Sequence, residues 1–321
     1  MKKVTVLGGG TGTFVVLTAL KSKPIDLGVI VSMMDSGGST GRLRDQLGVL
    51  PPGDLRQCLV ALSEAPLLWR QLFLYRFESG DLEGHNFGNI FLSALEKVSK
   101  NYEQVIKTVS YVLKIKGEVI PVTFEKTNLV AKYENGVTLE GETKIDTNYS
   151  EKSKIIETYL KPTVEANPNA LKRLAESDYI IVGPGDLYTS IIPVLLVSKI
   201  RDTIKKSKAK IICVLNLMTR SGQTPNYKAS DHIGDLNRYL GKKIDFVVVN
   251  DGKIPEDVLK WYIDHNENVV LDDLDQEKEI IIKANLISKI KFSKENSDIL
   301  MRSILRHDPK KLSEVLSKII L

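Results

Sequence analysis

Short apolar runs recur along the chain, separated by polar turns and by longer segments with helical periodicity. The first run, Val4–Leu7, is partly β-branched and ends at glycines, as expected of a strand that ends in a tight turn. The same pattern predicts further strands at Leu27–Val31, Tyr179–Val182, Ile211–Leu215 and Phe246–Asn250. Because helical segments lie between these runs, we predict an α/β fold that is Rossmann-like and doubly wound, with a mostly parallel sheet.

Segments whose apolar residues recur with the helical period predict the helices. One follows the first glycine turn, where Phe14, Leu17 and Leu20 share a face. In Leu67–Phe77 we interpret the apolar face, with its aromatic residues, as core packing. The other predicted helices are Asp54–Leu62, Ile90–Val98, Asn169–Glu176, an apolar segment through Val197, Ala229–Leu240, Pro255–Asn266 and Pro309–Ile320.

Between Val119 and Leu160 the pattern changes to short extended runs. An Asn135-Gly136 pair separates two of them, which is a strong hairpin signal. We therefore expect a small antiparallel β insertion at about 119–160, within a single domain that spans residues 1–321. We expect the insertion to cover the core and to carry no catalytic residues. Its runs are Val119–Phe124, Leu129–Tyr133, Val137–Leu139 and Lys154–Leu160.

The composition is that of an ordinary globular protein, with 42% apolar and 26% charged residues among 321. The net charge of +5 comes from dispersed lysines, so a nucleic-acid partner is not expected. Cys58 and Cys213 lie in apolar segments and predict buried, unpaired thiols in a reducing compartment. No apolar run approaches a membrane span, and a strand begins where a signal peptide would stand, so we expect a cytoplasmic protein.

The glycine-rich turn Gly8–Thr13 is the first candidate for ligand binding. Glycines let backbone N–H groups approach an anion, and the N-terminus of the following helix favours negative charge. We expect Gly9, Gly10, Thr11, Gly12 and Thr13 to hold a phosphate. The dinucleotide-binding pattern fails at Thr13 and Val15, and no Walker A lysine follows. A structural turn without a ligand is the alternative.

Two further polar loops follow the next strands. The first contains Asp35, Ser36, Ser39 and Arg42, and Asp54 follows it at the start of a predicted helix. Carboxylates and arginines among glycines are typical of a loop that wraps a charged ligand.

The second loop contains His85, Asn86 and Asn89. The two amides suit base or sugar recognition, while capping of the next helix by Asn89 is the alternative. His85 could act as a base, but a single histidine beside a glycine is more often structural.

Seven segments resemble the CofD/YvcK family and occur in the family's order. They are GGGTGT, MMDSGGSTGRLR, LPPGDLRQCL, GHNFGNIFLSAL, GPGDLYTSIIP, NLMTRSGQT and the late Arg306-His307-Asp308. DSGGSTGRLR and GHNFGN resemble the YvcK branch, the bacterial gluconeogenesis factors. This chain departs from the family at Asp186, where serine is common. A carboxylate there would repel a phosphate unless a cation intervened.

The resemblance implies a regulatory protein that binds a nucleotide sugar such as UDP-N-acetylglucosamine and is linked to central carbon metabolism, the cell envelope and cell shape. It also implies a homodimer, a cleft-lining loop around Asn216, and an Arg306 that helps to hold the ligand. The regulatory partner stays unknown. The residues expected to contact the ligand are Gly9, Gly10, Thr11, Gly12, Thr13, Asp35, Ser36, Ser39, Arg42, Asn86, Asn89, Gly185, Asn216, Thr219 and Arg306.

The alternative is a transferase of the CofD type, which transfers a phospholactyl group from a nucleotide-activated substrate and needs Mg²⁺. Asp35 and Asp54 would then hold the metal together with substrate phosphates. No residue pattern indicates an activated nucleophile, so we assign no catalytic residue. A nicotinamide-dependent dehydrogenase is disfavoured because the dinucleotide pattern fails.

Overall fold

The computed structural model describes residues 1–149, 152–274, 280–289 and 303–321. Its main sheet has seven parallel strands in the order β10-β9-β8-β7-β1-β2-β3. The predicted α/β fold with a parallel sheet is therefore confirmed. The strands are β1 Lys3–Gly8, β2 Asp26–Val31, β3 Glu118–Pro121, β7 Tyr179–Val182, β8 Lys210–Val214, β9 Phe246–Asn250 and β10 Ile280–Ala284.

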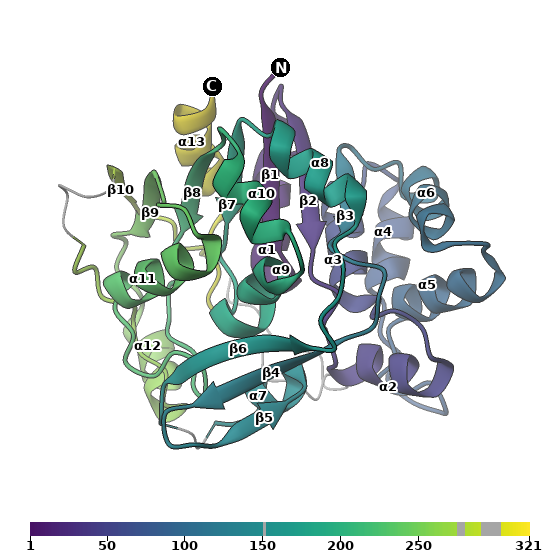
Figure 1. Cartoon of the computed structure of the whole chain (residues 1–321), viewed down its shortest axis with the longest axis horizontal. Helices are drawn as coiled ribbons and strands as arrows, with labels where there is room; N and C mark the ends of the chain where they lie inside the picture. The colour runs from purple at the N-terminus through teal and green to yellow at the C-terminus, as the bar shows by residue number, and fades with distance from the viewer. Residues whose placement is uncertain (150–151, 275–279, 290–302) are drawn as a thin grey trace.

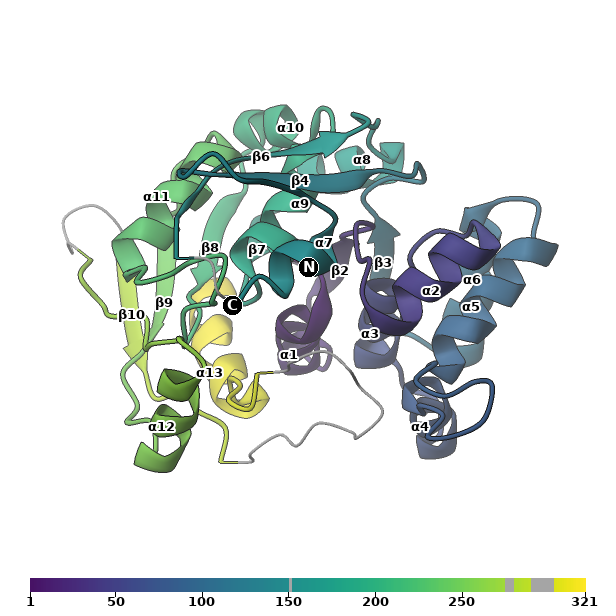
Figure 2. The same ribbon diagram turned by 90° about the horizontal axis from the view of Figure 1, so that it is seen from below.

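Helices cover both faces of this sheet, which is why its central strands are apolar throughout. Figure 2 shows α8 to α11 on one face and α1, α3 and α13 on the other. The two cysteines are buried and unpaired, as predicted. The helices are α1 Gly10–Leu20, α2 Gly38–Leu47, α3 Gly53–Leu62, α4 Leu67–Leu74, α5 Phe87–Val98, α6 Tyr102–Leu113, α7 Glu142–Asp146, α8 Pro168–Glu176, α9 Ile192–Leu196 with a π-helical turn at Leu187–Ile191 before it, α10 Ile200–Lys206, α11 Ala229–Leu240, α12 Glu256–Asp264 and α13 Pro309–Ile320.

The strand order reverses between β1 and β7. From β1 the chain crosses to β2 and β3 on one side, whereas β7 to β10 extend the sheet on the other side. The loops that leave the carboxyl ends of β1 and β7 consequently turn in opposite directions. Such a reversal opens the crevice in which open α/β sheets bind ligands.

A second sheet of three antiparallel strands, β5-β4-β6, lies across the carboxyl ends of the main strands (Figure 1). Its strands are β4 Asn128–Tyr133, β5 Thr138–Glu140 and β6 Ile155–Lys161, and the hairpin at Asn135-Gly136 is present. The predicted start of the insertion was wrong, because Val119 and Ile120 lie in β3 and pair in parallel with β2. A short apolar run does not reveal which sheet it joins.

Other elements also differ from the sequence prediction. The loop around Ser39 and Arg42 is helical from Gly38 onward, as α2. Helices α6 and α10 were not predicted, and neither was β10, although it begins with three isoleucines. The interpretation of the α4 segment as core packing is correct for the buried Phe73 and wrong for Trp69, which is 41% exposed. Within the described ranges, no helix has the length and apolar character needed to cross a bilayer.

The turn after β1 touches the turn after β7 through bare backbone. A Cβ built at Gly12 would overlap the carbonyl group of Pro184. Glycine at this position therefore serves the packing of the two turns, whatever ligand they hold.

We predict that Gly12→Ala lowers the free energy of unfolding by about 1–3 kcal/mol, because the two turns must move apart. The matched control is Gly234→Ala in α11, where a built Cβ has no neighbour within 4 Å. That control should gain about 0.5–1 kcal/mol from its lower backbone entropy. Urea unfolding of both variants tests this. Equal stabilities would show that the contact between the turns is not tight.

Candidate ligand-binding site

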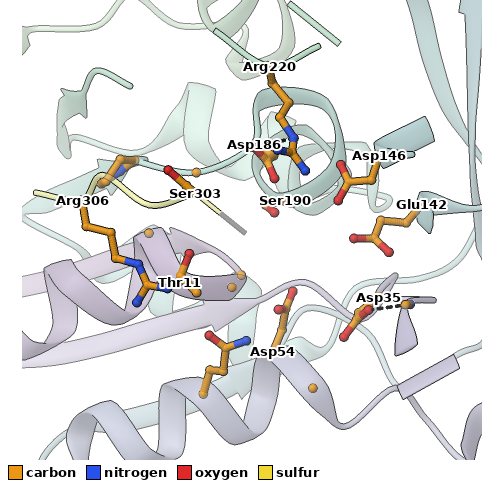
Figure 3. Close-up of a pocket in the computed structure, with 18 of the residues that line it drawn as sticks. Thr11, Asp35, Asp54, Glu142, Asp146, Asp186, Ser190, Arg220, Ser303 and Arg306 are labelled. Atoms are coloured by element: carbon orange, nitrogen blue, oxygen red, sulfur yellow. Dashed lines mark hydrogen bonds and ion pairs between the residues drawn. The ribbon is translucent and has the colours of Figure 1, made fainter. Parts of the chain in front are cut away.

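A cavity of about 190 Å³ lies beyond the carboxyl ends of β1, β7 and β8. Its walls come from segments that are far apart in the sequence, including the glycine turn, the loop after β2, α7 and the segment before α13 (Figure 3). The structure therefore brings most of the predicted ligand residues together. Those that line the cavity are Gly9, Gly10, Thr11, Gly12, Asp35, Ser39, Asn89, Gly185, Asn216, Thr219 and Arg306.

Four predicted ligand residues lie outside the lining: Thr13 is buried, and the other three make hydrogen bonds to other parts of the chain. The Thr13 side chain is buried beneath the turn, where its hydroxyl would lie 2.7 Å from a Cβ built at Gly8. Ser36 donates its backbone N–H to Glu142 Oε2 at 3.1 Å. Arg42 donates from Nη2 to the Glu83 carbonyl at 2.9 Å.

Asn86 is the fourth, and it caps α5. Its side-chain oxygen accepts the Asn89 N–H at 3.2 Å, and its amide nitrogen donates to the Leu74 carbonyl at 2.8 Å. Asn86 rather than Asn89 therefore plays the capping role. Asn89 accepts from Arg56 Nε at 2.8 Å and donates to Ser39 Oγ at 3.3 Å, so its amide organises the wall of the cavity.

Ser39 and His85 form the one serine–histidine contact at this wall among the described residues, with 3.2 Å between Oγ and Nδ1. Burial, followed by the charges of Arg42 and Arg76, lowers the pKa of His85, which favours the neutral imidazole. Ser39 Oγ also accepts from the Asn86 N–H at 3.1 Å and from Asn89. Because two N–H groups donate to the oxygen, both of its lone pairs are engaged, and Ser39 is a structural hub of the cavity wall.

The glycine turn presents the N-terminus of α1 to the cavity. Its N-cap residue is Gly9, which has no side chain of its own, and the first turn of the helix carries no acidic residue. Gly10 has φ = +66°, and a Cβ built there would have no neighbour closer than 3.8 Å. The N–H groups of the first turn and the helix dipole favour an anion at this end of the cavity.

Arg306 lies on the same side of the cavity as Thr11 (Figure 3). Its backbone is fixed on both sides, because the Ser288 N–H donates to the Arg306 carbonyl at 3.0 Å and the Asp308 N–H donates to the Leu286 carbonyl at 2.7 Å. Asp308 then caps α13 through the Lys310 N–H at 2.8 Å. The arginine is thus held where it can face a diphosphate.

Four carboxylates line the same cavity: Asp35, Glu142 and Asp146 lie away from Thr11, and Asp54 lies beside the glycine turn (Figure 3). Glu142 and Asp146 come from α7, in the insertion that we expected to cover the core. The insertion also contributes to the wall of the cavity, which the sequence analysis did not predict. The available signal was their spacing of four residues, which places both on one face of a helical turn.

Glu142 is the most perturbed of these groups. Burial, then the charges of Asp35 and Asp146, raise its pKa well above the usual range. The Ser36 N–H works against this by stabilising the anion. Burial beside other carboxylates therefore favours the protonated form of Glu142 at this end of the cavity.

Arg220 explains the unusual Asp186. Its Nε lies 4.0 Å from Asp186 Oδ1 and its Nη1 lies 3.2 Å from Glu267 Oε1. Burial opposes the charged form, but the carboxylates of Asp186 and Asp146 outweigh it and raise the pKa of Arg220. Asp186 therefore faces a permanent cation. This is the cation that the sequence analysis required if a carboxylate at position 186 is not to repel a phosphate.

Comparison with known proteins agrees with this architecture. Residues 4–287 match the sequence profile of the family described as 2-phospho-L-lactate transferase CofD. The gluconeogenesis factor of Bacillus subtilis is 36% identical over 320 residues, which cover 98% of this chain and 96% of that protein. The gluconeogenesis factor of Listeria monocytogenes is 40% identical over 80% of each chain. This chain belongs to the CofD/YvcK family.

A solved structure supports the same assignment. Protein BH3568 of Bacillus halodurans superimposes with a TM-score of 0.88 at 34% identity, over 98% of this chain and 99% of that one. It is described as a member of the UPF0052 family. The whole fold, including the insertion, is therefore shared with a protein of known structure.

The family raises the question of a metal ion. Among the described residues, no group of three or more His, Cys, Asp or Glu side chains could hold one alone. Asp35 and Asp54 both line the cavity, and the Asp54 carboxylate lies against Gly9. This arrangement fits Mg²⁺ held jointly by one or two carboxylates and by phosphates of a ligand.

We predict that Glu142→Gln stabilises the protein at neutral pH. In the unfolded chain Glu142 titrates near its ordinary pKa of 4.5, whereas the folded protein holds the proton to a higher pH. The free energy of unfolding therefore falls as pH rises between these two pKa values, and the penalty persists above them. A neutral glutamine removes the penalty and still accepts the Ser36 N–H, for a gain of about 0.5–2 kcal/mol at pH 7.

Thermal unfolding at pH 4 and pH 7 measures this effect. The advantage of Glu142→Gln should be present at pH 7 and nearly absent at pH 4. The exposed Glu125 supplies the control, Glu125→Gln, for which no such difference is expected. A stability gain that does not depend on pH would contradict the assignment of charge repulsion to Glu142.

Proposed function

We propose that the protein binds a nucleoside diphosphate sugar, of the UDP-N-acetylglucosamine kind, and acts as a regulatory protein in central carbon metabolism and in the control of the cell envelope and cell shape. The relatives named gluconeogenesis factors support the metabolic part of this proposal. We also propose a cytoplasmic location, because two buried, unpaired thiols suit a reducing compartment.

The observation that carries the proposal is the division of the cavity into two ends. The glycine-rich N-terminus of α1 and Arg306 suit a diphosphate. The opposite end offers the carboxylates of Glu142 and Asp146, which accept hydrogen bonds from hydroxyl groups. A ligand that is anionic in one part and rich in hydroxyls in another matches both ends.

The engaged lone pairs of Ser39 support binding over covalent catalysis. The Asn216 amide is likewise engaged, because it exchanges hydrogen bonds with the backbone of Gly185 at 3.1 and 2.8 Å. Asn216 therefore shapes the cavity by fixing the turn after β7. We expect the ligand to be held and released unchanged.

Calorimetric titration with UDP-N-acetylglucosamine tests the proposal, with GDP and NAD as competitors and with and without Mg²⁺. We expect micromolar, uridine-selective binding and recovery of the intact ligand. A preference for GDP together with a requirement for Mg²⁺ would contradict the proposal and favour the transferase.

Gly10→Asp tests the position of the diphosphate. The new carboxylate would lie beside Asp54, whose Oδ1 is 3.8 Å from a Cβ built at Gly10, and would repel a phosphate. We expect at least tenfold weaker binding, about 1.4 kcal/mol. Gly10→Asn is the matched control, since asparagine has the same shape, carries no charge and tolerates positive φ. Equal loss in both variants would show that space, rather than charge, limits this position.

A transferase of the CofD type is the second candidate, and the placement of Asp35 and Asp54 at the cavity favours it. If a metal ion and phosphates meet there, Asp35→Asn should remove the Mg²⁺ dependence of binding or turnover. Asparagine can still accept the Gly37 N–H, which Asp35 Oδ1 now accepts at 2.9 Å. The exposed Asp45 supplies the control, Asp45→Asn. Full Mg²⁺ dependence in Asp35→Asn would exclude Asp35 as a ligand.

A further inference from the structure

The turn after β7 continues into the π-helical turn Leu187–Ile191 before the chain enters α9. The Ile191 N–H donates to the carbonyl of Asp186, five residues earlier, at 3.1 Å, which makes this turn wider than a turn of α-helix. Single π-helical turns are rare and often occur at functional sites. This one begins directly after Asp186, which lines the ligand cavity, so its side chains are candidates for ligand contact.

Three consecutive side chains of the π-helical turn point to three different parts of the molecule. Tyr188 is buried and donates from its hydroxyl to Asp235 Oδ2 of α11. Thr189 donates from Oγ1 to Asp146 Oδ1 of α7 at 3.0 Å. Ser190 instead lines the ligand cavity (Figure 3). Because α11 and α7 hold the first two side chains, the third has a fixed position in the cavity wall.

Hydrogen bonds to the loop after β8 hold the same turn. The Tyr188 N–H donates to Gln223 Oε1 at 3.3 Å, and Gln223 Nε2 donates to Thr189 Oγ1 at 3.1 Å. Ser190 therefore stands on backbone that is already ordered without a ligand. A contact made from such backbone costs little conformational entropy when a ligand binds.

The hydroxyl of Ser190 faces the glycine turn. Its Oγ lies 4.0 Å from a Cβ built at Gly10, which is in the first turn of α1. Among the described residues, Ser190 Oγ has no hydrogen-bond partner. Ser39, by contrast, accepts from two N–H groups. Ser190 thus offers a hydroxyl proton beside the helix terminus that favours an anion.

Two carboxylates lie close to these turns, and neither excludes an anion. Arg220 Nε lies 4.0 Å from Asp186 Oδ1 and offsets its charge. Asp54 Oδ1 lies 3.8 Å from the Cβ built at Gly10, so Asp54 would meet a phosphate there through a cation such as Mg²⁺. Ser190 needs no cation, because a hydroxyl donates directly to a phosphoryl oxygen.

We propose that Ser190 Oγ donates a hydrogen bond to a phosphoryl oxygen of the ligand, so that one phosphate contacts both the turn after β1 and the π-helical turn after β7. This inference rests on the proposed function for the presence of a diphosphate. It adds a binding residue that the glycine pattern could not indicate, because Ser190 is far from Gly10 in the sequence and reaches it only through the fold.

Calorimetric titration of the full chain with UDP-N-acetylglucosamine and, separately, with inorganic pyrophosphate tests the proposal. We expect Ser190→Ala to bind both ligands about five- to tenfold more weakly, the loss expected for one hydrogen bond to a charged group. Ser110→Ala is the matched control, because Ser110 is a half-buried serine of α6 outside the cavity lining. It should leave both affinities unchanged.

Phosphorus-31 NMR of the bound ligand separates a direct contact from an indirect effect. At saturating ligand, the phosphate signals should differ between Ser190→Ala and the wild type and agree between Ser110→Ala and the wild type. Unchanged affinity in Ser190→Ala, or weaker binding with unchanged phosphate signals, would overturn the hydrogen bond and leave the proposed function standing. Wild-type protein that binds pyrophosphate but not UDP-N-acetylglucosamine would contradict the proposed function alone, and protein that binds neither would overturn both.

Discussion

The architecture of the site depends on one contact between backbones. The turns after β1 and β7 meet at the point where the strand order reverses, and no side chain at Gly12 separates them from the Pro184 carbonyl. This contact sets the direction of α1 and therefore the direction in which the N–H groups of its first turn point. The Asn216 amide holds the same turn from β8. Three adjacent strands thus converge on one small region of backbone.

The charges around the cavity follow from this geometry. On one side the partial charge of a helix terminus is reinforced by Arg306. On the other side α7 adds Glu142 and Asp146 to Asp35, and burial followed by the charges of Asp35 and Asp146 raises the pKa of Glu142. Arg220 neutralises only part of this charge, because it is shared among Asp186, Asp146 and Glu267. The cavity is therefore polar along its length but asymmetric in sign.

Much of the fold could be predicted because local sequence determined it. Strand β7 and helices α11 and α13 have the boundaries that their apolar periodicity indicates. The glycine turn was identifiable for the same reason. Residues whose roles depend on distant partners could not be placed in this way. Asn86 and Asn89 have identical chemistry in one loop, and only the backbone conformation at Asn86 makes it the cap.

The small sheet has a consequence for how binding preference can change. The chain builds the two ends of the cavity from separate pieces, with the anion-binding end on the main sheet and part of the acidic end on α7, between β5 and β6. Tyr133 of β4 fixes this insertion by donating to the Gly222 carbonyl at 2.9 Å, away from the glycine turn. For the ligand we propose, substitutions in the insertion would therefore alter which hydroxylated group fits, while the backbone proposed to face the phosphates stays as it is. Affinity and selectivity can evolve independently in such an arrangement.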